Sequence, residues 1–203
     1  TNKIKDLRFK IKLDTNGTNP EMLKKLIAPP VKGGKGVKEV GKAGEQNPLI
    51  PPLQGGLIDY IAMDIKAPLE KYGEVVGLPN IQAVKSVPPL IKGGRGIFKG
   101  TKEQTPGELT GLLNRVKKSI KIIIDSGLPY EFRTTVVPGL IKKEDIKKIG
   151  EMIKGADKWF LQQFKPDTEL VNKKFQKVRP YSSKELEEMR KIGEKYVKEC
   201  GVR

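Results

Sequence analysis

Three polar clusters in the sequence combine residue types that can bind a charged small molecule. The clusters are Asp14-Thr15-Asn16, Asp64 with Lys66, and Arg133. Carboxylates can hold an ammonium group, a ribose hydroxyl or a hard cation, and a threonine hydroxyl can add an oxygen ligand. Lysine and arginine can neutralise a carboxylate, arginine through its planar fork. Together these residue types predict a site for a zwitterionic small molecule.

A turn or capping role is the alternative for each cluster taken singly, because Asp and Asn suit both roles. Lys66 lies two residues after Asp64, so both side chains point to the same side of an extended chain. Such a pair would hold both groups in their charged forms. The occurrence of all three clusters at the ends of strand-like segments favours binding over three independent turns. Apart from Lys66 the set offers no nucleophile with a base, so no catalytic residue is assigned.

The segments that carry the clusters have the apolar patterns of strands, followed by helical spacing. Strands are predicted at residues 8–13, 57–65, 130–137 and 158–164. Helices are predicted to begin near Pro20, with Thr18 or Asn19 as the cap, and near Pro68, Thr105, Lys143 and Ser182. Thr105 with Glu108 and Ser182 with Glu185 have the spacing of capping boxes. The last helix is predicted to reach Cys200, whose place on the apolar face indicates a buried thiol.

This alternation of strands and helices predicts an α/β fold with a parallel sheet and right-handed crossovers. Four such units make half of an eight-stranded barrel, or an open, partly closed one. In these folds the chemistry takes place at the carboxyl ends of the strands, where the three polar clusters fall. Half a barrel would also expose an open sheet edge and an apolar interior.

Two stretches rich in Pro and Gly, residues 29–56 and 88–100, interrupt the pattern. Both contain variants of one unit, as in "PPVKGGKGV" and "PPLIKGGRGI". Their composition disfavours helices and central strands, so we interpret them as inserted loops within one domain spanning residues 1–203.

The composition limits the possible chemistry and partners. The chain has 40 Lys and Arg against 24 Asp and Glu, a formal net charge of +16, which favours polyanions as an alternative class of partner. It has no histidine and one cysteine, so it cannot build a zinc site or a cysteine-held cluster alone. The lack of a disulfide framework fits a cytoplasmic protein.

Four segments resemble the radical S-adenosylmethionine activating proteins of anaerobic ribonucleoside-triphosphate reductase, within the family of glycyl-radical-enzyme activases. They are "KLDTNGTNPEMLKKLI", "LIDYIAMDIKAPLEKYGEVVG", "YEFRTTVVPGLIKKEDIKKIGEMIKGA" and "WFLQQFKP". The specific signal is the order of "DTNG", "MDIK" and "RTTVVPG" at successive strand ends. The resemblance covers nearly the whole chain outside the two Pro/Gly-rich stretches.

The resemblance implies a partial (β/α)₆ barrel that binds S-adenosyl-L-methionine. Its cofactor site would comprise Asp14, Thr15, Asn16, Asp64, Lys66 and Arg133. Lys66 and Arg133 would lie near the methionyl carboxylate or the substrate. A monovalent cation would lie between Asp14, Thr15, Asp64 and the carbonyl of Ala62. The family's histidine near the cofactor would fall in "LQQFKP", where this sequence has none.

The family's Cys-x₃-Cys-x₂-Cys loop and its glycine-rich segment belong to strands that precede those found here. We therefore expect the 203 residues to represent the C-terminal two-thirds of the family fold, without the ligands of the [4Fe-4S] cluster, and to be inactive as an enzyme alone. The resemblance implies that the whole enzyme forms a 5′-deoxyadenosyl radical and with it a glycyl radical on the reductase or another glycyl-radical enzyme. Flavodoxin or ferredoxin would supply the electron.

Two alternatives rest on the residues alone. Lys66 at a strand end could form a Schiff base, as in aldolases, although Asp64 would favour its ammonium form. The net charge and the "GGKG" and "GGRG" sequences could instead indicate a basic module that binds nucleic acid.

Overall fold

The computed structural model describes residues 9–28, 57–76, 106–166 and 173–203. The described strands are β1 (Lys12–Thr15), β2 (Tyr60–Asp64), β3 (Tyr130–Val136), β4 (Lys158–Gln163) and β5 (Glu199–Val202). The helices are α2 (Pro20–Ile27), η1 (Leu69–Lys71), α3 (Tyr72–Val75), α5 (Pro106–Ile124), α6 (Lys143–Met152), η2 (Lys173–Lys177) and α7 (Ser183–Gly193). The predicted inserted loops, residues 29–56 and 88–100, and the proposed cap Thr105 lie outside the described residues.

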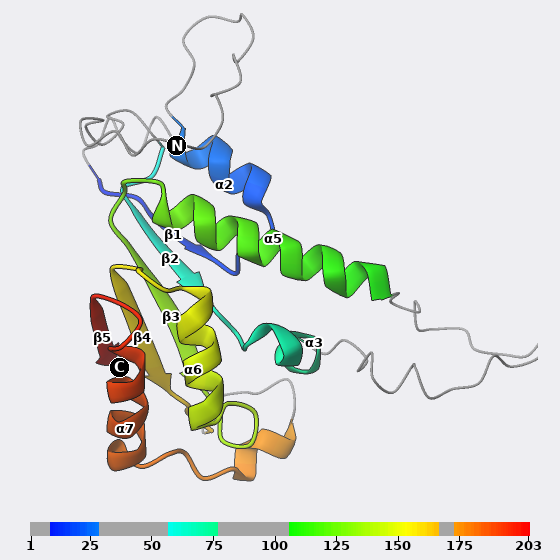
Figure 1. The fold of residues 1–203 in the computed structure, drawn as a ribbon, viewed down its shortest axis with the longest axis vertical. Coiled ribbons are helices and arrows are strands. Elements are labelled where there is room, and N and C mark those ends of the chain that lie inside the picture. The colour runs from blue at the N-terminus through cyan, green and yellow to red at the C-terminus, as the bar shows by residue number, and fades with distance from the viewer. Residues whose placement is uncertain (1–8, 29–56, 77–105, 167–172) are drawn as a thin grey trace, which may run out of the picture.

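The strands form one parallel sheet in the order β1-β2-β3-β4-β5, which confirms the predicted α/β class (Figure 1). Sequential order with right-handed crossovers places the connecting helices on one face of a sheet. Figure 1 shows α5, α6 and α7 together on one side. This winding is that of a barrel wall, but the described sheet is open, with β1 and β5 as its outer strands.

The hydrophobic core lies between the sheet and these helices. Alternate strand residues point to this layer and meet the apolar faces of the helices. Its fully buried members include Ile61, Met63, Phe132, Trp159, Leu161, Val116, Ile123, Ile146 and Ile149. One hydrogen bond crosses the core side of the sheet, from Trp159 Nε1 to Thr134 Oγ1, at 3.0 Å.

Helix ends follow the predicted capping chemistry. Asn19 caps α2 by accepting a hydrogen bond from the Met22 amide at 3.0 Å, and Pro20 occupies the first turn. Ser182 and Glu185 form the predicted capping box of α7.

Two sequence expectations about the elements were wrong. The first strand begins at Lys12 rather than residue 8, because β2 begins opposite Lys12; Phe9 is therefore 65% exposed. The last helix ends at Gly193, and Cys200 lies in β5, which the sequence analysis missed. Cys200 is nevertheless buried, as predicted.

The prediction of an apolar interior is also wrong. It fails on the face of the sheet opposite these helices. The alternate residues on that face are mostly polar or charged, and they interact with one another. They include Lys12, Asp14, Tyr60, Asp64, Glu131, Arg133, Phe160 and Arg203. This polar face carries the candidate site.

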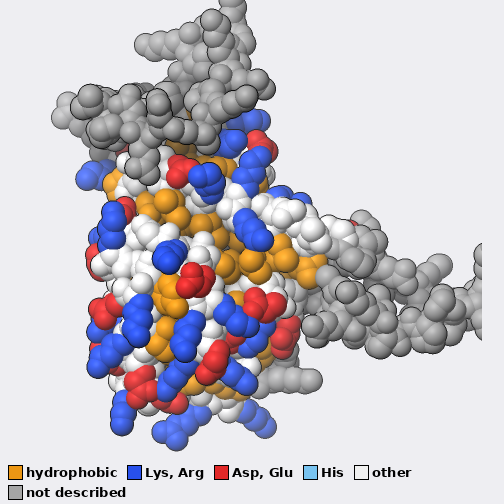
Figure 2. Space-filling model, in the orientation of Figure 1, with side chains coloured by type: hydrophobic (Ala, Val, Ile, Leu, Met, Phe, Trp, Pro, Cys, Tyr) orange, Lys and Arg blue, Asp and Glu red, His pale blue; other side chains and the backbone are white. Residues whose placement is uncertain are grey.

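Figure 2 views the molecule from the side of the helices. Lysine and arginine side chains are scattered there among aspartate and glutamate side chains, with apolar side chains gathered along α5. Several of the lysines form ion pairs, among them Lys118 with Glu21, Lys143 with Glu188, and Lys148 with Glu70. The positive charge on this side is therefore spread over solvated helix surfaces.

Candidate functional site

An ionic cluster joins the carboxyl ends of the first three strands. Arg133 Nη2 lies 2.7 Å from Asp14 Oδ1, and Arg133 Nε lies 2.9 Å from Asp64 Oδ1. Lys66 Nζ lies 2.8 Å from the other carboxylate oxygen of Asp64. The structure thus brings together four of the six residues proposed from the sequence.

The sheet register explains how residues far apart in sequence meet. Asp64 and Arg133 are direct partners in the ladder between β2 and β3. Asp14 pairs with Ala62, whose small side chain lies between Asp14 and β3. Asp14 can therefore extend past Ala62 to reach Arg133, two strands away. The carboxyl edge of a parallel sheet is the usual position of ligand sites in α/β proteins.

The cluster is electrostatically balanced, with two carboxylates against two cations. Burial raises the pKa of Asp64, but the hydrogen bonds and charges of Lys66 and Arg133 outweigh this effect and leave the pKa below its usual value. Burial acts to lower the pKa of Arg133, while Asp64 and Asp14 raise it more. Both groups are therefore ionised at neutral pH.

Thr15 and Asn16 form local turn contacts. Thr15 Oγ1 accepts a hydrogen bond from the Gly17 amide at 3.1 Å, and Asn16 Oδ1 accepts one from the Thr18 amide at 3.1 Å. Gly17 has a φ of 73°, which favours glycine. These contacts correspond to the turn role that the sequence analysis kept as an alternative.

The cluster is partly exposed to solvent. The Asp14 side chain is 56% exposed, whereas that of Arg133 is 17% exposed. Two carboxylates can bind an ammonium group, and Lys66 with Arg133 can bind a carboxylate. The donor set therefore fits the zwitterionic amino-acid end of S-adenosylmethionine.

An iron–sulfur cluster does not fit the residues of this chain. Cys200 is its single cysteine, and it is buried on the helix side of β5 against Gly193 and Trp159. Within the described ranges, no three His, Cys, Asp or Glu side chains are grouped to hold a metal ion. Cluster thiolates would have to come from outside these 203 residues.

A second ionic network on the same face was missed by the sequence analysis. The Glu131 side chain is only 2% exposed. It accepts two hydrogen bonds from Arg203, at 3.0 and 2.9 Å, and one from the Tyr60 hydroxyl at 3.1 Å. Lys12 Nζ lies 3.4 Å from Glu131 Oε1. Strand alternation could have placed Glu131 on this face, but the sequence contains no signal that pairs it with such distant partners.

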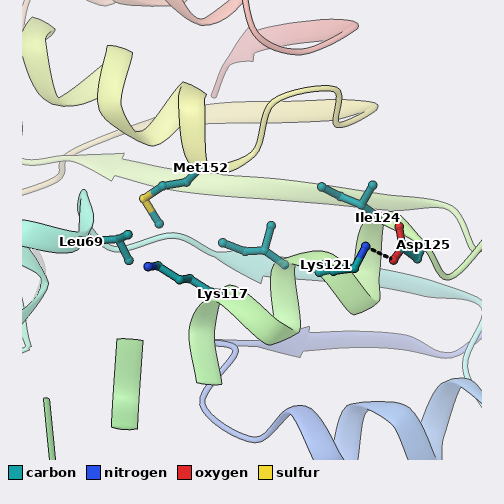
Figure 3. Close-up of a pocket in the computed structure, with 7 residues that line it drawn as sticks. Leu69, Lys117, Lys121, Ile124, Asp125 and Met152 are labelled. Carbon is teal, nitrogen blue, oxygen red and sulfur yellow. Dashed lines mark ion pairs between the residues drawn. The ribbon is translucent and has the colours of Figure 1, made fainter. Parts of the chain in front are cut away.

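A pocket lies apart from the ionic cluster, on the helix side of the sheet (Figure 3). Its volume is about 350 Å³, and it lies between α5, η1 and α6. The residues lining it are Leu69, Lys117, Ile120, Lys121, Ile124, Asp125 and Met152. Its one pair of opposite charges is the ion pair of Lys121 with Asp125, at 2.9 Å. The pocket is mainly apolar and carries no arrangement suited to binding a zwitterion.

Comparison with known proteins found one distant similarity that extends over almost the whole chain. No known family model matches the chain. The chain is a distant relative of a Methanocaldococcus jannaschii protein named "Putative glycyl-radical enzyme activating enzyme", with 28% identity over 199 residues. The similar region is 98% of this chain and 60% of the relative, so the chain spans about three-fifths of that protein's length.

None of the helices in the described ranges is both long and apolar enough to cross a lipid bilayer.

Proposed function

We propose that the chain forms the part of a radical S-adenosylmethionine activase that binds the charged methionyl end of S-adenosylmethionine. The observation that carries the proposal is the cluster of Asp14, Asp64, Lys66 and Arg133 at the carboxyl ends of adjacent parallel strands. The distant relative named as a glycyl-radical enzyme activating enzyme supports the same class.

The residues have distinct proposed roles toward the ligand. Arg133 and Lys66 hold the methionyl carboxylate, and Asp14 and Asp64 hold the methionyl ammonium or the ribose hydroxyls. Thr15 and Asn16 shape the turn that carries Asp14. When bound, S-adenosylmethionine supplies the radical chemistry of such activases. The proposed monovalent cation would share Asp14 and Asp64 with Arg133.

The proposed partner is anaerobic ribonucleoside-triphosphate reductase, in the cytoplasm, with flavodoxin or ferredoxin as electron donor. This assignment rests on the motif order "DTNG", "MDIK" and "RTTVVPG". A direct test is binding of the immobilised chain to the purified reductase and to a second glycyl-radical enzyme. Selective retention of the reductase supports the assignment; equal or reversed retention contradicts it.

The ligand proposal is tested by calorimetric titration of the chain with S-adenosylmethionine. Binding that is lost in both Arg133→Gln and Asp64→Asn supports the proposal, with Arg115→Gln on the exposed side of α5 as the matched control. Binding that is unchanged in both variants excludes the cluster as the site.

The two alternative functions have weaker support. Schiff-base chemistry needs an amine that is free to attack a carbonyl group, but Lys66 Nζ forms an ion pair with Asp64 Oδ2 at 2.8 Å. Borohydride trapping of a carbonyl adduct at Lys66 would establish that alternative. The "GGKG" and "GGRG" sequences lie outside the described residues, so nucleic-acid binding rests on the net charge of +16. Retention of nucleic acid at low salt would test it.

A further inference from the structure

The Phe160 ring lies over Gly201, its neighbour on β5, on the polar face of the sheet. Phe160 and Gly201 are direct partners in the ladder between β4 and β5. A Cβ atom at Gly201 would lie 2.7 Å from Phe160 Cε1 and 2.8 Å from Cδ1. Any other residue at this position would displace the aromatic ring, so Gly201 provides the space that the ring occupies.

The guanidinium group of Arg203 stacks on this ring. Arg203 Cζ lies 3.6 Å from the centroid of the Phe160 ring. The two hydrogen bonds to the buried Glu131 carboxylate, at 3.0 and 2.9 Å, fix the orientation of the guanidinium group. Contact with an aromatic face and a fork on a carboxylate both exploit the planarity of arginine. Although it makes these contacts, the Arg203 side chain remains 46% exposed.

This platform, defined as Phe160 with Arg203, lies directly beside the ionic cluster. Arg133 and Phe160 are ladder partners on β3 and β4, so their side chains leave the same face of the sheet. Neighbouring strands are about 4.8 Å apart. A ligand with a charged group at Arg133 and a planar ring one or two strands away would therefore contact both features.

We propose that Phe160 and Arg203 form a platform for the planar base of a nucleoside whose charged group binds at the ionic cluster. This inference rests on the proposed function, under which the base is the adenine of S-adenosylmethionine. Bases stack on aromatic rings and on guanidinium planes, because every base has a π face. Glu131 holds the guanidinium group over the ring, and the exposed part of the Arg203 side chain can receive the base.

The test compares three ligands that contain different parts of the nucleoside sulfonium. S-adenosylmethionine has the base and the charged end, S-methylmethionine has the charged end alone, and 5′-methylthioadenosine has the base alone. Arg203→Lys keeps the positive charge but removes the planar guanidinium group. Phe160→Leu keeps an apolar side chain but removes the aromatic ring. Arg115→Lys is the control for an arginine-to-lysine change. Thermal melts verify that each variant is folded.

We expect Arg203→Lys to weaken both adenine-containing ligands by about tenfold, the size of one lost stacking contact. Phe160→Leu should weaken the same two ligands by a smaller factor, because the ring supports the guanidinium group and does not itself touch the base. Neither variant should change the affinity for S-methylmethionine. An equal loss for all three ligands, or no loss for the adenine-containing ones, overturns the platform.

The two proposals fail in different ways. If the chain binds 5′-methylthioadenosine through Arg203 but binds neither sulfonium, the platform stands and the proposed function fails. If it binds S-methylmethionine but gains nothing from the adenine, the ionic cluster stands and the platform fails. Absence of binding by all three ligands overturns both.

Discussion

Arg133 and Asp14 lie two strands apart in the sheet, yet Arg133 Nη2 is 2.7 Å from Asp14 Oδ1. The same guanidinium group holds Asp64 through Nε. One arginine thus joins the ends of three strands, and any anionic ligand must compete with two carboxylates that are already in place. The cluster is therefore preassembled and charged before a ligand arrives.

Arg133→Gln should raise the pKa of Asp64 toward its usual value of 3.8, because a positive charge and a hydrogen bond to its ionised form are removed. Lys66→Gln should act in the same direction. The measurement is an NMR titration of the Asp64 carboxyl group, with Arg115→Gln as a distant control. An unchanged titration in Arg133→Gln would show that the ion pair is absent in solution.

Glu131→Gln should lower the free energy of unfolding at pH 7 by about 2 kcal/mol, since a buried carboxylate loses charge-assisted hydrogen bonds. Burial raises the pKa of Glu131, but hydrogen bonds from Arg203 and Tyr60 and the nearby positive charges have a larger, opposite effect. The pKa of Glu131 is therefore lower than its usual value. A carboxyl group with a lowered pKa stabilises the fold above its unfolded pKa, and this contribution is lost as the pH falls through the folded pKa.

The difference between wild type and Glu131→Gln should therefore shrink as the pH falls below about 4.5, the usual pKa of the group. Urea unfolding curves at pH 7 and pH 3, followed by the fluorescence of Trp159, measure this difference in the free energy of unfolding. An equal difference at both pH values would contradict the role of the charge.

Thr134→Val should destabilise the fold by about 1–3 kcal/mol, because it leaves the buried Trp159 indole N–H without its acceptor. Thr134→Ser keeps the hydroxyl and should recover most of the loss. If the serine variant is as unstable as the valine variant, packing and not the hydrogen bond is responsible.

Gly193→Ala should be destabilising by about 1–3 kcal/mol, since the added Cβ atom would lie 2.6 Å from Cys200 Sγ and 3.1 Å from the Trp159 ring. Gly111→Ala in α5 is the matched control. There the nearest atom is Arg115 Nη1 at 3.4 Å, so alanine should stabilise the helix by about 0.5–1 kcal/mol. Chemical denaturation of both variants separates the steric effect from helix propensity.

Cys200 should resist thiol reagents at pH 8 while the protein is folded. Burial raises the pKa of its thiol to about 12, so the reactive thiolate is scarce. A chromogenic disulfide reagent should detect one thiol promptly in urea and very slowly in buffer, because the chain has one cysteine. Rapid reaction without urea would mean that β5 separates readily from the sheet.

The parts of the fold predictable from sequence were those specified by local patterns. Ser182 with Glu185 and Asn19 with Pro20 marked helix starts because capping depends on residues a few positions apart. The end of α7 was missed because Tyr196, Val197 and Cys200 continue a helical spacing beyond Gly193, where the chain in fact turns into β5.

The candidate site was predictable only in part, for the same reason. Asp14, Asp64 and Arg133 could be grouped because parallel strands end at one edge, so position along each strand was enough. The Glu131 network could not be predicted, because Arg203 and Lys12 are 72 and 119 residues away from Glu131 in sequence. Their meeting depends on the register of five strands, and the apolar interior expected there is replaced by ion pairs.

Because the order of the strands in space is their order in the chain, each strand emerging from the ribosome can add to the edge left by the one before it. Lys12 and Tyr60 are synthesised before Glu131, and Arg203 follows 72 residues later. The nascent sheet must therefore carry the Glu131 carboxylate without its strongest partner until translation has passed residue 203.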